Sequence, residues 1–374
     1  MTKYDKYDIL IKNISKEVFL LKNGSKDKWE IPIYTKSQIN KAGKIIASKT
    51  APKEEQEQAI KILNNWRAAH AYPLQVICNN LRSRNPRAIV VQRLKRLESI
   101  TNKIQRFPDM QLYKMQDLGG CRVIVDKVEQ VYKTINNYKN SRSKHILKRE
   151  YDYIANPKSS GYRSYHMVYQ FHSELKETYN QNMFIEVQFR TKLQHIWATA
   201  VEMMGIYTKS NLKSSQGDED ILRFFKLVSS VFALQENMPV CPDTSNNLNE
   251  LISEIKELDK AHKIISTLNS LNVIINKTGE QINHKGKNNK NTYYILILDY
   301  KEMVVTVKQF QSSKIENATK VYDAIEKDPN VNVVLVSANS FDTLRVAYPN
   351  YFADIYNFIN ILQSLLIKSN KIKD

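Results

Sequence analysis

Asp117-Leu-Gly-Gly-Cys-Arg-Val-Ile-Val125 has the pattern of a buried strand entered through a glycine pair, with a carboxylate and a guanidinium at its mouth. The chain has only nine glycines, and glycine is used where backbone approaches another group closely. A second stretch, Glu186-Val-Gln-Phe-Arg190, alternates polar and apolar residues, so its three polar side chains share one face of a strand. A charged strand face is unusual in a protein core. The two stretches therefore predict a sheet with a polar site on one face.

The segments around these stretches alternate between helical and strand patterns and predict an α+β domain that ends near residue 210. Helices are expected at 53–85 (broken or kinked at Pro73), 97–106, 128–138 and 192–204, and strands at 88–92, 121–125, 145–154, 164–171 and 184–189.

The rest of the chain predicts a second, smaller part. A helical region begins at Asp218 and runs to about residue 276, and a polar run at 281–291 has the composition of a linker. Beyond it, a ββαβα pattern to residue 367 predicts a compact C-terminal unit. We therefore divide the chain into a basic N-terminal helical region (1–54), the sheet domain (55–210), a helical connector and linker (211–290) and a C-terminal domain (291–374).

The composition indicates a globular protein, because 42% hydrophobic and 10% aromatic residues exclude a mainly disordered chain. No apolar run is long enough to span a bilayer and no signal-peptide pattern is visible, so we expect a cytoplasmic protein without a membrane partner. Cys78, Cys121 and Cys241 lack the spacing of metal ligands or of a disulfide framework, and we expect buried free thiols.

The net charge of +18 is concentrated in one part of the chain. Residues 1–150 hold 31 basic and 14 acidic residues, a net +17, whereas the remaining residues hold 25 and 24, a net +1. Such a localised charge favours a polyanionic partner, although solvated helix faces are an equally common explanation. The arginines near residue 85 favour nucleic acid, since the guanidinium group suits phosphate.

Asp117 and Glu186 are the candidate metal ligands. If the sheet brings them together among the neighbouring cations, they form a Mg²⁺ site of the type that also binds substrate phosphates. A surface ion-pair network is the alternative.

Four motifs follow one another over about 100 residues: Arg93-x-Lys95-x-x-x-Ser99, Asp117-Leu-Gly-Gly-Cys-Arg122, Asp152-Tyr-Ile-Ala-Asn-Pro-Lys158-x-x-Gly-Tyr162-x-Ser-x-His166, and Glu186-Val-Gln-Phe-Arg190. In this order they resemble the synthetase domain of the RelA/SpoT family. The resemblance implies a nucleotidyltransferase-like mixed sheet flanked by helices. It also implies transfer of the β,γ-pyrophosphate of ATP, with Mg²⁺, to a 3′-hydroxyl.

The resemblance also implies roles for single residues. Arg93, Lys95, Ser99 and Lys103 would hold the phosphates of ATP and Arg122 would contact the nucleotide. Asp117 and Glu186 would bind Mg²⁺, and Glu186 would activate the acceptor hydroxyl. Tyr162 would stack on the acceptor base, with Lys158, His166, Gln188 and Arg190 around it. Structural alternatives are a helix cap for Ser99, solvated lysines at positions 95 and 103, and a core histidine at position 166.

Further features resemble the toxic small alarmone synthetases that modify the 3′ CCA end of tRNA, and among them the fused toxin–antitoxin proteins called CapRel. They are the chain length, the Trp66-Arg-x-x-His70-x-x-Pro-Leu74 helix and the Tyr348-Pro-Asn-Tyr351 element. The resemblance implies that the C-terminal domain is an intramolecular antitoxin. Tyr348 and Tyr351 would cover the ATP site until a phage capsid-type protein binds; the alternative is two core tyrosines.

Three functions follow for testing. The first is an ATP:tRNA pyrophosphotransferase that blocks translation, with Arg67, Arg82, Arg84 and Arg87 as tRNA contacts. The second is an alarmone synthetase that pyrophosphorylates a nucleotide. The stretch Tyr162-Arg-Ser-Tyr-His-Met167 departs from the Tyr-x-Ser-Leu-His-Thr usual in that branch, which leaves the acceptor open. The third is a catalytically inactive RNA-binding module. No His-Asp dipeptide occurs, so the hydrolase of the longer relatives is not expected.

Overall fold

The computed structural model describes residues 29–48, 50–107, 109–208, 210, 212, 216–269, 292–299, 304–311, 315–326, 328, 331–338 and 355–368. Its first part contains α2 (Lys36–Ala47), α3 (Lys53–Ala69), α4 (Ala71–Arg84), β1 (Ile89–Leu94), α5 (Leu97–Arg106), η1 (Leu112–Lys114), β2 (Gly119–Val125), α6 (Val128–Lys139), β3 (Ile146–Asp152), β4 (Tyr165–Gln170), η2 (Glu177–Tyr179), β5 (Phe184–Thr191) and α7 (Lys192–Tyr207). Then follow α8 (Glu219–Gln235), α9 (Leu248–His262), β6 (Thr292–Asp299), β7 (Val304–Phe310), α11 (Ile315–Ile325), β8 (Val331–Ala338) and α14 (Tyr356–Lys368).

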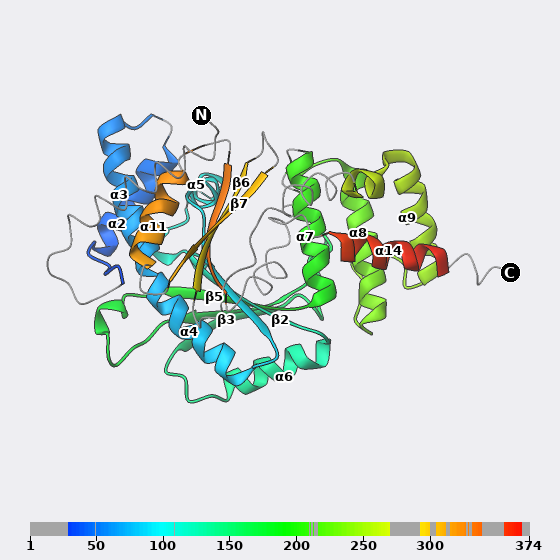
Figure 1. Cartoon of the computed structure of the whole chain (residues 1–374), viewed down its shortest axis with the longest axis horizontal. Coiled ribbons are helices and arrows are strands. Elements are labelled where there is room, and N and C mark those ends of the chain that lie inside the picture. The colour runs from blue at the N-terminus through cyan, green and yellow to red at the C-terminus, as the bar shows by residue number, and fades with distance from the viewer. Residues whose placement is uncertain are drawn as a thin grey trace.

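The strands form one eight-stranded sheet in the order β3-β4-β5-β2-β1-β8-β6-β7. β2 and β5 pair in parallel, and the other neighbours are antiparallel. This mixed sheet with flanking helices confirms the expected α+β class (Figure 1).

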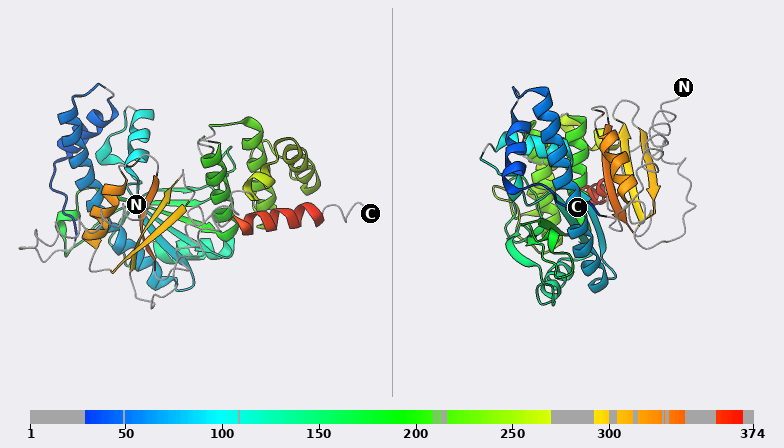
Figure 2. Two further views of the ribbon diagram at one scale, coloured as in Figure 1. Left: turned by 45° about the horizontal axis from the view of Figure 1, so that its top comes forward. Right: turned by 90° about the vertical axis from the view of Figure 1, so that its left-hand side faces the viewer.

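The C-terminal strands continue the central sheet. β8 pairs with β1, where Gln92 lies opposite Ser337 and Arg93 opposite Val336, and Figure 2 shows β6–β8 in yellow to orange beside the earlier strands. α14 packs against α7 and α9. In the described residues the C-terminal elements come in the order β6-β7-α11-β8-α14, and α11 packs on β6 and β8 in an apolar core of its own. β8 also covers the edge that β1 would otherwise leave unpaired.

The described residues form three apolar cores, of which one lies between α11, β6 and β8 and the other two lie on opposite faces of the sheet. Residues of α3, α4 and α6 pack on the face that carries Val123, Ile185 and Val187. Residues of α7, α8, α9 and α14 pack on part of the other face, beside Val91 and Ile124. Arg122, Glu186 and Gln188 share that second face by strand alternation, in the part that these helices leave open.

The helix expected at 53–85 is broken at His70, three residues before Pro73. Proline has no N–H and is tolerated in the first turn of a helix, so the chain starts a new helix just before it. Asp218 accepts hydrogen bonds from the backbone N–H groups of Asp220 and Ile221, and so caps α8.

Two further expectations concern composition. Cys78, Cys121 and Cys241 are buried and free, as predicted. Among the residues that the structure describes, no helix combines the length and the apolar character that crossing a bilayer requires.

Candidate active site

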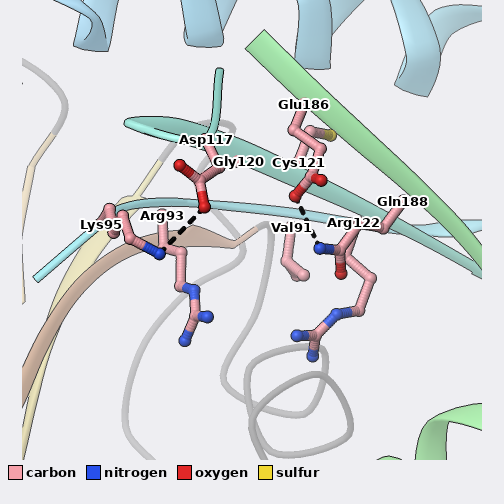
Figure 3. Close-up of a pocket in the computed structure, with 9 residues that line it drawn as sticks. All are labelled: Val91, Arg93, Lys95, Asp117, Gly120, Cys121, Arg122, Glu186 and Gln188. Carbon is pink, nitrogen blue, oxygen red and sulfur yellow. Dashed lines mark hydrogen bonds and ion pairs between the residues drawn. The ribbon is translucent and has the colours of Figure 1, made fainter. Parts of the chain in front are cut away.

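A pocket of about 130 Å³ opens on the free part of the sheet face (Figure 3). It brings together six residues that the sequence singled out: Arg93, Lys95, Asp117, Arg122, Glu186 and Gln188.

The register of three strands builds this pocket. Gly120 lies opposite Arg93 on β1 and beside Glu186 on β5. A Cβ on the neighbouring Gly119 would come within 2.6 Å of Ile185 Cδ1, so the glycine lets β2 and β5 pack closely. The glycine pair therefore holds the two carboxylate-bearing segments together.

Asp117 stands among cations. Its Oδ2 accepts hydrogen bonds from Lys95 Nζ at 3.0 Å and Lys103 Nζ at 2.9 Å. Burial would raise the pKa of this carboxyl, but the two ammonium groups outweigh burial and lower it. Ser99 lies in the first turn of α5, half-buried, on the helix that carries Lys103.

Five side chains form a closed hydrogen-bond ring, which we call the Glu186 ring. Its members are Glu186, His166, Tyr162, Arg190 and Gln188. His166 Nδ1 and Gln188 Nε2 bond the two oxygens of Glu186 at 2.9 and 2.8 Å. Tyr162 Oη lies 2.8 Å from His166 Nε2, and Arg190 Nη2 donates to Tyr162 Oη at 2.6 Å and to Gln188 Oε1 at 3.0 Å. The ring fixes the carboxylate that faces the pocket.

Contacts within the Glu186 ring change the pKa values of three of its members, Glu186, Tyr162 and His166. Burial opposes ionisation of Glu186, yet hydrogen bonds from His166 and Gln188 lower its pKa to about 2. Burial would also raise the pKa of Tyr162, but the charges of Arg190 and His166 lower it to about 7. The pKa of His166 is raised, because Tyr162 and Glu186 outweigh its burial.

We expect Glu186 to make acid unfolding steeper. Its folded-state pKa of about 2 lies below the ordinary value of 4.5, so the ionised carboxylate stabilises the fold above pH 4.5 and this contribution is lost as the pH falls toward 2. Urea unfolding at several pH values should show a flatter decline for Glu186→Gln than for the unaltered chain in this window. Parallel curves would contradict the low pKa.

The loop at 156–162 is held by α7 and α8. Gly161 has a φ of 87°, and a Cβ there would lie 3.0 Å from Trp197 and 3.2 Å from Ser229. Ser229 Oγ donates to the carbonyl of Gly161 at 2.6 Å, and the buried Arg163 donates to Ser229 Oγ at 3.1 Å. These contacts set the position of Tyr162.

Two tyrosines beside the ring were not among the predicted site residues. Tyr151 and Tyr153 stack with centroids 5.7 Å apart, and Tyr153 meets the His166 ring edge to face at 5.3 Å. Lys158 Nζ lies 4.3 Å from the centroid of the Tyr153 ring and 5.5 Å from that of Tyr162. The signal that sequence reasoning missed was the Tyr-x-Tyr spacing, with Tyr151 near the end of β3 and Tyr153 in the turn that follows it.

The four arginines predicted to bind tRNA do not form one patch. Arg67 is buried, so it is not available to RNA in this conformation, which corrects that prediction. Arg82 is half-buried and donates to the carbonyl of Val90 at 3.2–3.3 Å. Arg84 and Arg87 are exposed, but they precede β1, whereas the site residues Arg93 and Lys95 lie at its far end.

Arg67 instead joins the C-terminal elements to the first part of the chain, in what we call the α11 junction. Its guanidinium binds Asp323 at 2.6 Å and Glu326 at 2.7 Å. Glu326 Oε1 also accepts a hydrogen bond from the backbone N–H of Leu97, the first residue of α5, at 2.7 Å. Arg67 Cζ lies over the ring of Tyr322 at 5.1 Å. Tyr348 and Tyr351 lie outside the described residues.

Asp117 and Glu186 fit a Mg²⁺ ion. Both line the pocket, and Asp117 Oδ1 is buried without a hydrogen-bond partner among the described residues. A buried carboxylate oxygen of this kind is a hard ligand such as Mg²⁺ requires.

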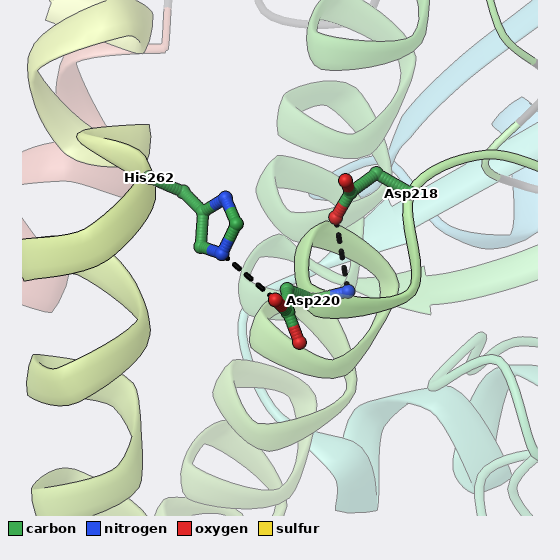
Figure 4. Close-up of side chains that lie close together, drawn as sticks. All are labelled: Asp218, Asp220 and His262. Carbon is green, nitrogen blue, oxygen red and sulfur yellow. Dashed lines mark hydrogen bonds and ion pairs between the residues drawn. The ribbon is translucent and has the colours of Figure 1, made fainter.

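A second group with metal-binding atoms lies elsewhere. Asp218, Asp220 and His262 have ligand atoms within 4.8 Å of one another, and all three are exposed (Figure 4). Asp218 caps α8, and His262 Nε2 pairs with Asp220 at 2.8 Å. Helix capping and one ion pair account for this group.

Part of the chain is similar to known proteins. Residues 92–212 match the family described as "Region found in RelA / SpoT proteins". Two Bacillus subtilis proteins, GTP pyrophosphokinase YjbM and GTP pyrophosphokinase YwaC, are 28% and 30% identical over 34% and 36% of this chain. The chain covers 61% and 64% of their lengths.

Part of the chain is also similar to solved structures. The small alarmone synthetase 1 from Bacillus subtilis, bound to its product pppGpp, is 22% identical with a TM-score of 0.38, over 46% of this chain and 90% of that one. Every residue of the pocket except Val91, and every member of the Glu186 ring, lies within residues 92–212. Residues 92–212 are therefore similar to a region found in RelA / SpoT proteins.

Proposed function

We propose that this region transfers the β,γ-pyrophosphate of ATP to a 3′-hydroxyl group. The observation that carries the proposal is one pocket in which two carboxylates, Asp117 and Glu186, lie among Arg93, Lys95 and Arg122. Phosphoryl transfer needs cations that spread the charge on the transferred oxygens and a carboxylate within reach of the attacking hydroxyl.

The donor would be held by cations around α5. Arg93, Lys95, Ser99 and Lys103 would bind the phosphates of ATP, and Arg122 the nucleotide. Asp117 and Glu186 would hold Mg²⁺, which would neutralise charge on the phosphates. Lys95 and Lys103 both pair with Oδ2 of Asp117, so the cations that would bind phosphate lie directly beside the carboxylate that would bind the metal.

The reaction forms a bond from the 3′ oxygen to the β-phosphorus of ATP and breaks the bond between that phosphorus and the α,β-bridging oxygen, so that AMP leaves. The hydroxyl proton passes to Glu186. A carboxylate with a pKa near 2 is a weak base, so its main effects are to orient the hydroxyl and to accept the proton late in the transfer. The Glu186 ring keeps the carboxylate ionised and fixed.

The acceptor that we propose is the 3′ CCA end of tRNA, whose modification blocks translation. Tyr162, Lys158 and His166 would contact the acceptor residue, with Gln188 and Arg190 positioned by the ring. A net charge of +17 over residues 1–150 exceeds what a mononucleotide needs and suits an RNA backbone. A guanine nucleotide is the second candidate, favoured by the names of the relatives, which are GTP pyrophosphokinases.

The acceptor is tested with γ-labelled ATP. The assay uses the full chain and its variant Arg67→Ala, which removes the α11 junction and with it the control in cis proposed below. Label should appear on the 3′ adenosine of tRNA, faster with the variant, and periodate oxidation of that terminal ribose should abolish labelling. GDP and GTP offered in parallel provide the comparison. Label on the guanine nucleotide with none on tRNA would replace the first candidate by the second.

We also propose control in cis by residues 291–374 as an antitoxin domain, released by a phage capsid-type protein. The α11 junction supports this. Ser99 would bind phosphate in the first turn of α5, and in this structure the carboxylate of Glu326 already occupies the first N–H of that helix. The N-terminus of a helix attracts anions, so the carboxylate of Glu326 bound at the start of α5 competes with a phosphate for the same position.

A further inference from the structure

A second and larger cavity, of about 670 Å³, lies next to the pocket. Its walls come from α2, from α5 and η1, from the middle of β3, from the end of β4 and from the start of β5. This volume is in the range of sites that hold small ligands, whereas the pocket of about 130 Å³ is smaller. We call this cavity the basic cleft.

The lining of the basic cleft is strongly positive. It includes Lys36, Lys103, Lys114, Lys148 and Arg149, and no carboxylate among the described residues that line it. Within the described part of the chain, the four other than Lys103 form no ion pair, and all four are exposed. Unpaired cations gathered around a cavity favour a ligand with several negative charges.

The basic cleft adjoins the reacting groups. Lys103 lines the cleft and also binds Asp117, which lines the pocket. Phe184 lines the cleft two residues before Glu186 on β5, on the same face of the strand and therefore about 7 Å away along it. A ligand in the cleft can thus be continuous with an acceptor at Glu186.

The cleft also offers aromatic surface. Phe107 is 45% exposed and Phe184 is half-buried. Cations that follow a backbone, combined with aromatic rings on which bases stack, are typical of sites for single-stranded nucleic acid. An acidic protein segment would use the cations but not the rings.

We propose that the basic cleft binds the phosphate backbone of the single-stranded RNA that precedes the acceptor's terminal 3′ residue. The inference rests on the RNA-acceptor function proposed above and names the part of the protein that selects a polynucleotide over a mononucleotide. Arg93, Lys95, Ser99 and Lys103 are the residues proposed to bind the ATP phosphates, so the other four cations of the cleft, Lys36, Lys114, Lys148 and Arg149, are additional to those needed for the donor.

The test reverses three charges of the cleft, in the variant K114E/K148E/R149E. Its binding to a short single-stranded RNA ending in CCA, with a dye at its 5′ end, is measured by fluorescence anisotropy at several salt concentrations. We expect binding at least about tenfold weaker at low salt, and a salt slope smaller by about two units, because each lost phosphate contact removes about 0.7 from the slope. Binding of a fluorescent ATP analogue should stay unchanged, which also shows that the variant is folded.

A matched control is K61E/K133E/K260E, which reverses three exposed lysines on α3, α6 and α9 that do not line the cleft. It should keep most of the RNA affinity. If it weakens RNA binding as much as the cleft variant, the effect belongs to the overall charge and the proposal is overturned. The glutamine variant K114Q/K148Q/R149Q replaces the first if charge reversal prevents folding.

The outcomes separate the two proposals. If the unaltered chain labels tRNA but the cleft variant binds RNA normally, the cleft is not the RNA site and the proposed function stands. If neither the unaltered chain nor the released variant Arg67→Ala binds or labels RNA, the RNA-acceptor function fails and this inference fails with it. If the cleft variant no longer labels tRNA but still labels a guanine nucleotide, the result supports both the RNA-acceptor function and the basic cleft as the RNA site.

Discussion

Replacing Glu186 by glutamine is expected to slow pyrophosphate transfer by about 10²–10⁴-fold, the range seen when a group that accepts a proton in the transition state is lost. The amide keeps the size of the side chain and an oxygen that accepts from His166 Nδ1 or Gln188 Nε2. It cannot take a proton from the acceptor hydroxyl and binds Mg²⁺ poorly. The measurement is the initial rate of label transfer from ATP, with each acceptor at saturation.

The control for this experiment is Glu174→Gln. Glu174 is exposed and pairs with Lys144 at 3.2 Å, away from the pocket, so its loss should leave the rate unchanged. RNA binding should survive in Glu186→Gln, because the basic cleft is intact. If Glu186→Gln transfers label within about threefold of the unaltered chain, the carboxylate has no chemical role. If growth arrest survives in Glu186→Gln, the inactive RNA-binding module becomes the better account.

Replacing Arg67 by alanine is expected to lower the free energy of unfolding by about 3–5 kcal/mol. The guanidinium is 2% exposed and binds Asp323, which is 28% exposed, and Glu326, which is 9% exposed. Its removal therefore leaves the buried carboxylate of Glu326 without a balancing positive charge. Burial would lower the pKa of Arg67, but Tyr322 and the two carboxylates raise it, so the charge is always present. Urea denaturation measures the loss.

Arg223→Ala is the matched control. Arg223 also binds a carboxylate with two nitrogens, at 2.6 and 2.8 Å from Glu254, but this pair is 32% and 40% exposed. Its loss should cost no more than about 1 kcal/mol. If both variants lose the same free energy of unfolding, burial of the α11 junction adds nothing to the stability of the protein.

The Arg67→Ala variant also tests control in cis. If the junction restrains the enzyme, the variant should transfer label faster than the unaltered chain, while Arg223→Ala should not. The same gain is expected for Glu326→Gln, which weakens the junction but keeps an oxygen for the N–H of Leu97. Unchanged rates in both junction variants would contradict control through α11, and the stability result would still stand.

Local patterns predicted most elements of the fold. The helix at Leu97–Arg106 has the expected bounds, because Phe107-Pro108 ends its periodic pattern. The pairing of β1 with β8 was beyond sequence reasoning. Both strands are apolar runs, and no local signal tells which of two distant strands completes an edge.

In the candidate site, too, local patterns predict some features, while others depend on contacts between segments far apart in the sequence. Alternation of polar and apolar residues along β5 is enough to predict that Glu186, Gln188 and Arg190 share one face. The closure of the Glu186 ring depends on the register that sets His166 opposite Gln188, which is a contact between strands. Arg67 was predicted to contact RNA because an arginine on a helix gives no sign of whether it faces solvent. Its partners Asp323 and Glu326 are more than 250 residues away along the chain.

Because more than 250 residues separate Arg67 from Asp323 and Glu326, the α11 junction forms late during synthesis on the ribosome. Residues 91–190 hold the pocket and the Glu186 ring, and they leave the ribosome well before residues 323 and 326. Earlier segments of a nascent chain generally fold first. A partly made chain would therefore carry an assembled site with β1 still an open edge and α5 not yet capped by Glu326. If the α11 junction restrains the enzyme, each newly made chain is unrestrained until residues 323 and 326 have been synthesised. This period lengthens when translation slows.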